Sequence, residues 1–232
     1  FIMFYIVDLK PDKSSVAFFL DRYLRIAPIY YLFTAVFVLS GFATITDFNQ
    51  VIQSLTFIKY FDTSPLLSIG WTLEYEFTFY SICVLAIYLF QNVIARKYFI
   101  ISVLIVLFIV FDLIIYNDKL YGHFLEFFFG IVVYEVYKKQ MICSSRILGF
   151  FSLFLLIVIL SFGHNYYATL GFPYLRFLLF GFPSALILWL ALSYETKWPP
   201  SKLLSILGDA SYSIYISHTF VFSWLYKLAS IE

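Results

Sequence analysis

The sequence predicts an all-α fold, a polytopic bundle of transmembrane helices. Of its 232 residues, 62% are hydrophobic and 23% aromatic, and only 12% are charged, whereas soluble domains carry about 25% charged residues. The apolar residues form long runs between short polar turns, and about 20 apolar residues suffice to cross a bilayer as a helix. We therefore expect a single membrane domain over residues 1–232, with about seven full spans plus an N-terminal remnant of another.

The first quarter of the chain shows how these elements follow one another. Residues 1–7 are typical of the last two turns of a spanning helix, and the Pro, Ser and charged residues at 8–15 predict a turn in water. Residues 16–25 mix aromatic and charged side chains, which predicts an interfacial stretch that leads into a span at 26–43. Residues 44–69 are less apolar, and we expect an outer loop with a short amphipathic helix on the membrane surface.

The remaining spans are predicted from apolar runs alone, at 69–90, 98–116, 120–137, 147–162, 174–193 and 203–226. If the crossings alternate, one side holds most Lys and Arg residues, and the positive-inside tendency makes that side cytoplasmic. The net charge of +1 and the lack of a basic run give no sign of a nucleic-acid partner. No clustered ligand set indicates a metal site, and Cys83 and Cys143 form no CxxC pair.

Two carboxylates, Glu74 and Glu76, stand at the head of an apolar run that carries no further charge as far as Ala95. Acidic groups at bilayer depth cost roughly 2.5–3.5 kcal/mol each on insertion scales, so such residues usually serve a function. Helical spacing places Glu76 on the same face as Tyr80, looking into the bundle, and turns Glu74 away toward the surface. Trp71, at the outer end, is most simply an interfacial belt residue.

Arg22 and Arg25 lie at the cytoplasmic mouth of the predicted span at 26–43. Their i, i+3 spacing lets two guanidinium groups converge on one anion. Two interpretations stay open: the pair sets topology and contacts lipid phosphates, or it clamps the phosphates of a soluble cytoplasmic donor. Pro28 is expected to end or kink the helix close by.

The last predicted span carries a polar stripe, because Ser211, Tyr215 and His218 fall at i, i+4 and i+7. Lipid offers hydroxyl groups no partners, so the stripe is expected to face other helices or water. His218 could be structural, a proton carrier or a substrate contact. Glu126, one turn after His123, could pair with that histidine.

Three segments, taken together, carry a resemblance to a known family. They are Gln53-Ser-Leu-Thr-Phe-Ile with Pro65 and Gly70-Trp-Thr-Leu-Glu-Tyr-Glu-Phe-Thr-Phe-Tyr80, then Asp21-Arg-Tyr-Leu-Arg-Ile-Ala-Pro-Ile-Tyr30, and Leu207-Gly-Asp-Ala-Ser-Tyr-Ser-Ile-Tyr-Ile-Ser-His218. In their order along the chain, 21–30, 53–80 and 207–218, they resemble the acyltransferase-3 family of integral membrane O-acyltransferases, and within it the exopolysaccharide-production acetyltransferase branch. Leu125-Glu-Phe-Phe-Phe-Gly130 also fits a pattern of that family.

The resemblance implies an enzyme of the bacterial inner membrane that transfers an acyl group other than an amino-acyl group. The group, usually acetyl, would pass from cytoplasmic acyl-CoA, a co-substrate and not a bound cofactor, to a hydroxyl of a cell-surface polysaccharide or its lipid-linked precursor. By resemblance Arg22 and Arg25 engage the donor, Glu76 and His218 are the catalytic candidates, and the core is lined by Trp71, Tyr80, Glu126, Ser211, Tyr212 and Tyr215. The other partners implied are membrane lipids.

The resemblance also marks an absence, because the family's proposed catalytic His belongs to a first span that these residues do not include. A last span also lies outside them, so we expect residues 1–232 expressed alone to be inactive. Two alternatives stay open: a non-enzymatic transporter of a polysaccharide or lipid intermediate, with Glu76 and His218 as a proton relay, and an inactive remnant. The acceptor sugar, its modified hydroxyl, the acyl chain and the oligomeric state are not predicted.

Overall fold

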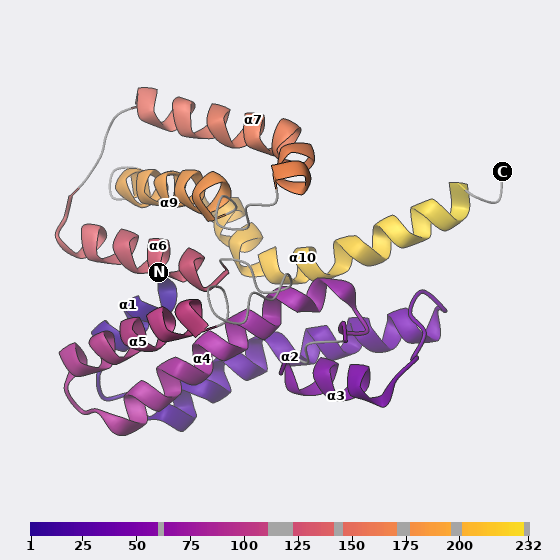
Figure 1. The fold of residues 1–232 in the computed structure, drawn as a ribbon, viewed down its shortest axis with the longest axis horizontal. Coiled ribbons are helices and arrows are strands. Elements are labelled where there is room, and N and C mark those ends of the chain that lie inside the picture. Colours follow the sequence, from indigo (N-terminus) through magenta and orange to yellow (C-terminus); the bar gives the residue numbers. More distant parts are fainter. Residues whose placement is uncertain (60–62, 111–122, 142–145, 171–176, 196–200, 230–232) are drawn as a thin grey trace. The chain divides into compact units, whose positions relative to one another are not determined.

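A computed structural model shows the chain as an assembly of helices (Figure 1). It describes residues 1–59, 63–110, 123–141, 146–170, 177–195 and 201–229. Within these ranges no strand occurs, in agreement with the all-α prediction. The helices form two compact units: unit 1 comprises residues 1–12 and 89–199, and unit 2 comprises residues 13–88 and 200–232.

Within the described ranges, unit 1 is built from six helical elements that pack against one another. They are α1 (Ile2–Leu9), α5 (Val93–Leu107), α6 (His123–Lys138), α7 (Arg146–Leu170), the π-helical turn η3 (Phe177–Gly181) and α9 (Phe182–Glu195). Helix α1 packs against α5 and α6, and α9 packs against α6 and α7. Figure 1 shows α6, α9 and α7 side by side. Asn92 begins α5 as its N-cap, since its side chain accepts a hydrogen bond from the Ile94 N–H at 2.8 Å.

A buried carboxylate ties the end of α1 to its neighbours. Asp8 accepts hydrogen bonds from Lys97 at 3.0 Å, from Lys138 at 2.6 Å and from the Tyr134 hydroxyl. Burial opposes ionisation of Asp8, but these hydrogen bonds outweigh it and lower its pKa to about 2. The Asp8 carboxylate therefore stays charged and holds α1, α5 and α6 together.

Unit 2 contains the segments that carried the resemblance. They fold as α2 (Ser15–Leu39), α3 (Phe48–Thr56), the short 3-10 turn η1 (Ser68–Gly70), α4 (Trp71–Leu89) and α10 (Lys202–Ala229). Ser14 caps α2 by accepting from the Ala17 N–H at 3.2 Å. Pro28 lies inside α2 without ending it, so the stretch predicted as interfacial and the span that follows form one helix. Helix α10 packs along α2.

Stacked aromatic rings form the core between α2, α3 and α4. The Phe57 and Phe77 rings stack with centroids 4.1 Å apart, and Tyr30 lies 5.1 Å from Phe57. Phe57 ends α3 in the left-handed conformation, at φ 56°. This backbone turn is costly for a bulky residue, and the ring stacking offsets it.

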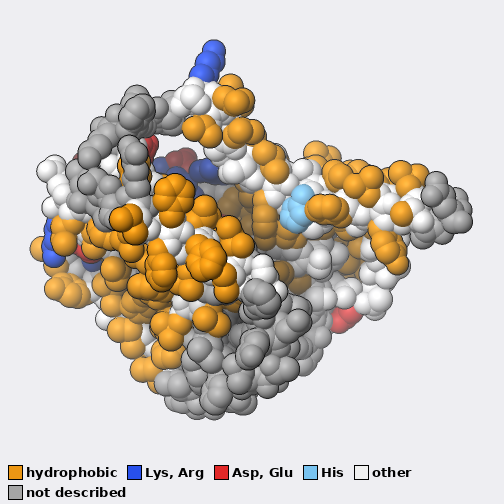
Figure 2. All heavy atoms as spheres, turned by 90° about the horizontal axis from the view of Figure 1, so that it is seen from above, with side chains coloured by type: hydrophobic (Ala, Val, Ile, Leu, Met, Phe, Trp, Pro, Cys, Tyr) orange, Lys and Arg blue, Asp and Glu red, His pale blue; other side chains and the backbone are white. Residues whose placement is uncertain are grey.

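A described helix overlaps each predicted span, but residues 111–116, 120–122 and 174–176 of those spans lie outside the described residues, and the number of spans stays a prediction. Among the described residues, three helical segments are long and apolar enough to cross a membrane: Ser15–Leu39, Val93–Val110 and Phe177–Glu195. The face in Figure 2 carries apolar side chains over much of its described surface, with few charged ones between them. Such a surface is typical of a protein in contact with lipid.

Candidate functional site

Glu76 and Tyr80 form a hydrogen-bonded pair in the first half of α4. The Tyr80 hydroxyl donates to Glu76 Oε2 at 2.8 Å, across one helical turn. Tyr80 is buried, at 7% exposure, and Glu76 is half-buried. This agrees with the expected juxtaposition of Glu76 with a tyrosine hydroxyl, and it leaves the second carboxylate oxygen of Glu76 available for another donor.

The prediction that Glu74 turns toward the surface is wrong. Glu74 is only 2% exposed, and its Oε1 accepts from Gln53 Nε2 at 2.5 Å. Thr63 donates to the same Gln53 side chain, and the Lys59 ammonium lies 3.8 Å from Glu74 Oε2. The physical reason is that the 44–69 segment, through Gln53 of α3, covers the side of α4 that carries Glu74. One signal in the sequence could have indicated this: Gln53 is a glutamine within the apolar face of an amphipathic helix.

Arg22 and Arg25 of α2 lie within electrostatic range of the pair on α4. Both guanidinium charges act on Tyr80, and that of Arg25 acts on Glu76. Arg22 Nε is buried and has no hydrogen-bond partner among the described residues, whereas Arg25 is exposed. The structure thus brings the two predicted arginines and the predicted glutamate together from separate helices.

Helix α10 contributes Tyr212 to the same cluster. The Tyr212 hydroxyl donates to the Ile26 carbonyl oxygen of α2 at 3.1 Å and lies within electrostatic range of Glu76. Ile216, one turn later, is completely buried. Phe220 continues the row with ring contacts to Phe33 and Phe37 of α2. Tyr212, Ile216 and Phe220 therefore form the face of α10 that packs on α2.

The stripe of Ser211, Tyr215 and His218 lies to the side of that packing face, because it is displaced by one residue. Ser211 and Tyr215 are exposed, and the core-lining role that the resemblance gives them stays a prediction. Tyr215 still reaches α4 through a 3.1 Å hydrogen bond with Thr72. Trp71 is 38% exposed, as an interfacial belt residue would be, and its core-lining role stays a prediction. The hydrogen-bond and ring contacts of His218 with described residues all lie within α10.

The cluster on α2, α4 and α10 therefore combines two guanidinium groups with a hydrogen-bonded carboxylate. Guanidinium groups suit phosphate groups, and a half-buried carboxylate beside a hydroxyl suits the handling of a proton. Among the described residues, no group of three or more His, Cys, Asp or Glu side chains is placed to hold a metal ion.

Comparison with known proteins identifies the family of the chain that carries this cluster. The family model for the acyltransferase domain matches residues 1–232, which is the whole chain. The chain belongs to the acyltransferase-3 family. It is accordingly an acyltransferase, as the three sequence motifs indicated, and the transporter interpretation loses its support.

One curated relative supports this assignment to the acyltransferase-3 family. The chain is 29% identical over 252 residues to the exopolysaccharide production protein ExoZ of Rhizobium meliloti (strain 1021). The match covers 98% of this chain and 74% of the relative. No solved structure matches the chain.

The remaining site candidate of this acyltransferase, Glu126, belongs to unit 1. It lies on α6 and lines a cavity of about 310 Å³ with Phe129 of the same helix and Gly181. The side chain of His123, its suggested partner, lies outside the described residues. Unit 1 therefore holds Glu126 beside a cavity, and its role stays a prediction.

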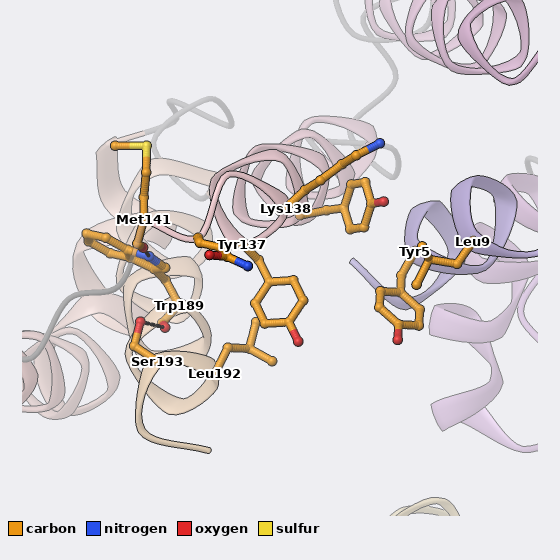
Figure 3. Close-up of a pocket in the computed structure, with 10 residues that line it drawn as sticks. Tyr5, Leu9, Tyr137, Lys138, Met141, Trp189, Leu192 and Ser193 are labelled. Atoms are coloured by element: carbon orange, nitrogen blue, oxygen red, sulfur yellow. Dashed lines mark hydrogen bonds between the residues drawn. The ribbon is translucent and has the colours of Figure 1, made fainter. Parts of the chain in front are cut away.

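A second cavity in unit 1, of about 390 Å³, is lined mainly by aromatic and apolar side chains. Figure 3 shows Tyr5 and Leu9 of α1 on one side of it and Trp189 and Met141 on another. None of the predicted site residues lines this cavity. The chemistry of the acyltransferase is therefore better sought in the cluster of unit 2.

Proposed function

We propose that this acyltransferase transfers an acyl group, most simply acetyl, from cytoplasmic acyl-CoA to a hydroxyl of a cell-surface polysaccharide or its lipid-linked precursor. The enzyme would work as a multi-pass protein of the bacterial inner membrane. The observation that carries the proposal is the convergence of Arg22, Arg25 and Glu76 in one cluster of a chain that belongs to the acyltransferase-3 family.

The arginines supply the donor end of the proposed site. The diphosphate of CoA carries negative charge on oxygens that accept hydrogen bonds, and a guanidinium group offers five N–H donors in a fixed fork. Arg22 Nε is buried and unpaired among the described residues, and such a donor gains most from an anionic partner. Arg25 is exposed, so it can meet a soluble donor as it arrives.

The carboxylate supplies the acceptor end. During transfer the acceptor hydroxyl attacks the thioester carbon, its proton must leave, and the C–S bond breaks to release CoA as a thiol. Glu76 holds one oxygen in the hydrogen bond from Tyr80 and can accept the sugar hydroxyl with the other. His218 of α10 is the second proposed proton-handling residue. The name of the relative, an exopolysaccharide production protein, supports a polysaccharide acceptor.

The clamp is tested by the dependence of the rate on acetyl-CoA concentration in membranes that contain the protein. Each hydrogen bond to a charged group is worth about 1.5–3 kcal/mol, so Arg22→Ala should raise KM for acetyl-CoA by about tenfold or more. Arg22→Lys keeps the charge and should give a smaller increase. Lys202→Ala removes an exposed cation at the start of α10 and is the matched control, with an unchanged KM. An unchanged KM in Arg22→Ala would refute the clamp.

The acceptor is tested in the strain that carries the gene. Deletion should remove ester acetyl signals from the NMR spectrum of the surface polysaccharide and leave the glycan backbone intact. Complementation with the wild-type gene should restore the signals, and complementation with Glu76→Gln should not. Retention of all acetyl esters after deletion would contradict the proposed acceptor class.

A further inference from the structure

Tyr30 carries a buried hydroxyl group without a hydrogen-bond partner. Its side chain is completely buried in the middle of α2, and among the described residues no donor or acceptor meets its oxygen with hydrogen-bond geometry. The Ser54 and Thr34 hydroxyls lie close by, but neither meets the Tyr30 oxygen with hydrogen-bond geometry. Ser54 accepts from the Leu66 N–H at 2.9 Å, and Thr34 donates to the Tyr30 backbone carbonyl at 2.8 Å. Tyr30 is thus an exception to the rule that buried polar groups are paired.

The unpaired hydroxyl carries an energetic cost that the fold does not require. A buried polar group without a partner destabilises a fold, whereas phenylalanine would fill the same ring volume without that cost. The Tyr30 ring already packs against Phe57, with centroids 5.1 Å apart. The hydroxyl itself adds nothing to this packing, so its presence calls for a role outside folding.

The surroundings of the hydroxyl include a position without a side chain. Tyr30 packs so closely on Gly70 that a methyl group there would overlap the hydroxyl oxygen. Gly70 ends the three-residue turn η1, directly before α4. Backbone therefore covers the hydroxyl at this point, and a displacement of that one short turn is what a ligand needs to reach it.

The position of Tyr30 along α2 relates it to the proposed clamp. Arg22, Ile26 and Tyr30 follow each other at intervals of four residues, and the Ile26 carbonyl receives the Tyr212 hydroxyl. The rise from Arg22 to Tyr30 is about 12 Å. The pantetheine arm of CoA is long enough to cover this rise, so phosphates held at Arg22 allow the thioester to lie near Tyr30 and Tyr212.

We propose that the Tyr30 hydroxyl donates a hydrogen bond to the carbonyl oxygen of the acyl thioester. This inference rests on the proposed function. As the acceptor oxygen bonds to the thioester carbon, the π electrons of the C=O bond move onto its oxygen. Tyr30 stabilises that negative charge. The electrons then return, the C–S bond breaks, and the sulfur leaves as thiolate and takes up the proton that the acceptor hydroxyl lost.

Adjacent tyrosines provide a matched pair for the test. Tyr30→Phe removes a hydroxyl that has no described partner, so thermal stability should stay equal or rise. Loss of one donor to a developing oxyanion typically lowers kcat by about 100-fold to 1000-fold, and KM for acetyl-CoA should change little. Tyr31→Phe removes a hydroxyl that donates to the Leu55 carbonyl, so it should lower stability and leave kcat per folded molecule unchanged.

The measurements are kcat and KM of the purified full-length protein that contains this chain, with acetyl-CoA and polysaccharide, and its melting temperature in the same detergent. If the wild-type protein transfers acetyl and Tyr30→Phe has the same kcat, the role of Tyr30 is overturned and the proposed function is not. A fall in the melting temperature of Tyr30→Phe that accounts for the lost activity would also overturn the inference. It would show that the hydroxyl has a structural role, through a hydrogen bond to the protein or to a buried water. No transfer by the full-length wild-type protein that contains this chain would overturn the proposed function and this inference together.

Discussion

The two glutamates of the Trp71–Tyr80 segment should fail in different ways when they are changed. Glu74 is 2% exposed and receives a 2.5 Å hydrogen bond from Gln53, with Lys59 at 3.8 Å. Glu74→Ala leaves the Gln53 amide buried without its acceptor, which costs about 1–3 kcal/mol. It also breaks the Lys59–Glu74 ion pair, but that pair is long and partly exposed and adds little.

The expected destabilisation by Glu74→Ala is therefore about 1–3 kcal/mol, which lowers the melting temperature by roughly 2–12 °C in a chain of this size. Glu74→Gln keeps an acceptor oxygen for Gln53 and should cost about 1 kcal/mol or less. Glu76→Gln should behave oppositely, with a melting temperature near that of the wild type and little remaining acyl transfer.

The assay is tryptophan fluorescence during heating of the purified protein in detergent, alongside acetyl transfer per folded molecule. A double-mutant cycle with Gln53→Ala isolates the interaction, and the double mutant should be less destabilised than the sum of the single mutants. A melting temperature within about 2 °C of wild type for Glu74→Ala would refute the structural role assigned to this carboxylate.

Two further predictions concern stability. Gly70→Ala should destabilise the protein by about 1–3 kcal/mol, because the new methyl group overlaps the buried Tyr30 hydroxyl. In a Tyr30→Phe background the same substitution should cost less, and equal losses in both backgrounds would contradict the overlap. Asp8 has a pKa of about 2, below its ordinary 3.8, so its stabilisation is present above pH 4 and is lost as the pH falls through 2. Asp8→Asn should therefore cost about 2 kcal/mol at neutral pH, and the difference in melting temperature from wild type should shrink between pH 4 and pH 2, whereas a constant difference would refute the linkage.

The positions of the helices could be predicted because bilayer helices need continuous apolar runs. The spans predicted at 69–90 and 203–226 correspond to α4 at Trp71–Leu89 and α10 at Lys202–Ala229. The start of the first full span was misjudged, since α2 already begins at Ser15. Charged side chains near a helix end indicate a boundary in hydropathy, but Arg22 and Arg25 are compatible with helical geometry and α2 continues through them.

Burial of individual side chains could not be predicted in the same way. Helical periodicity distinguishes the faces of α4, but it does not say which face is covered. Glu76 was expected inside and Glu74 outside, and Glu74 proved the more buried because Gln53 of α3 lies against it. Likewise, polarity suggested the face with Ser211, whereas α10 packs through the neighbouring face that holds Tyr212.

By itself, the sequence determined that this protein is an all-helical acyltransferase, because composition, apolar run length and ordered motifs are properties of the chain alone. It also supplied Arg22, Arg25 and Glu76 as candidates. Only the tertiary structure decided that these three residues converge, that Glu74 is held by Gln53, and that the Tyr30 hydroxyl is buried without a described partner. The physical reason is that such pairings join residues far apart in the chain, so they depend on how helices dock and not on the local pattern of any one of them.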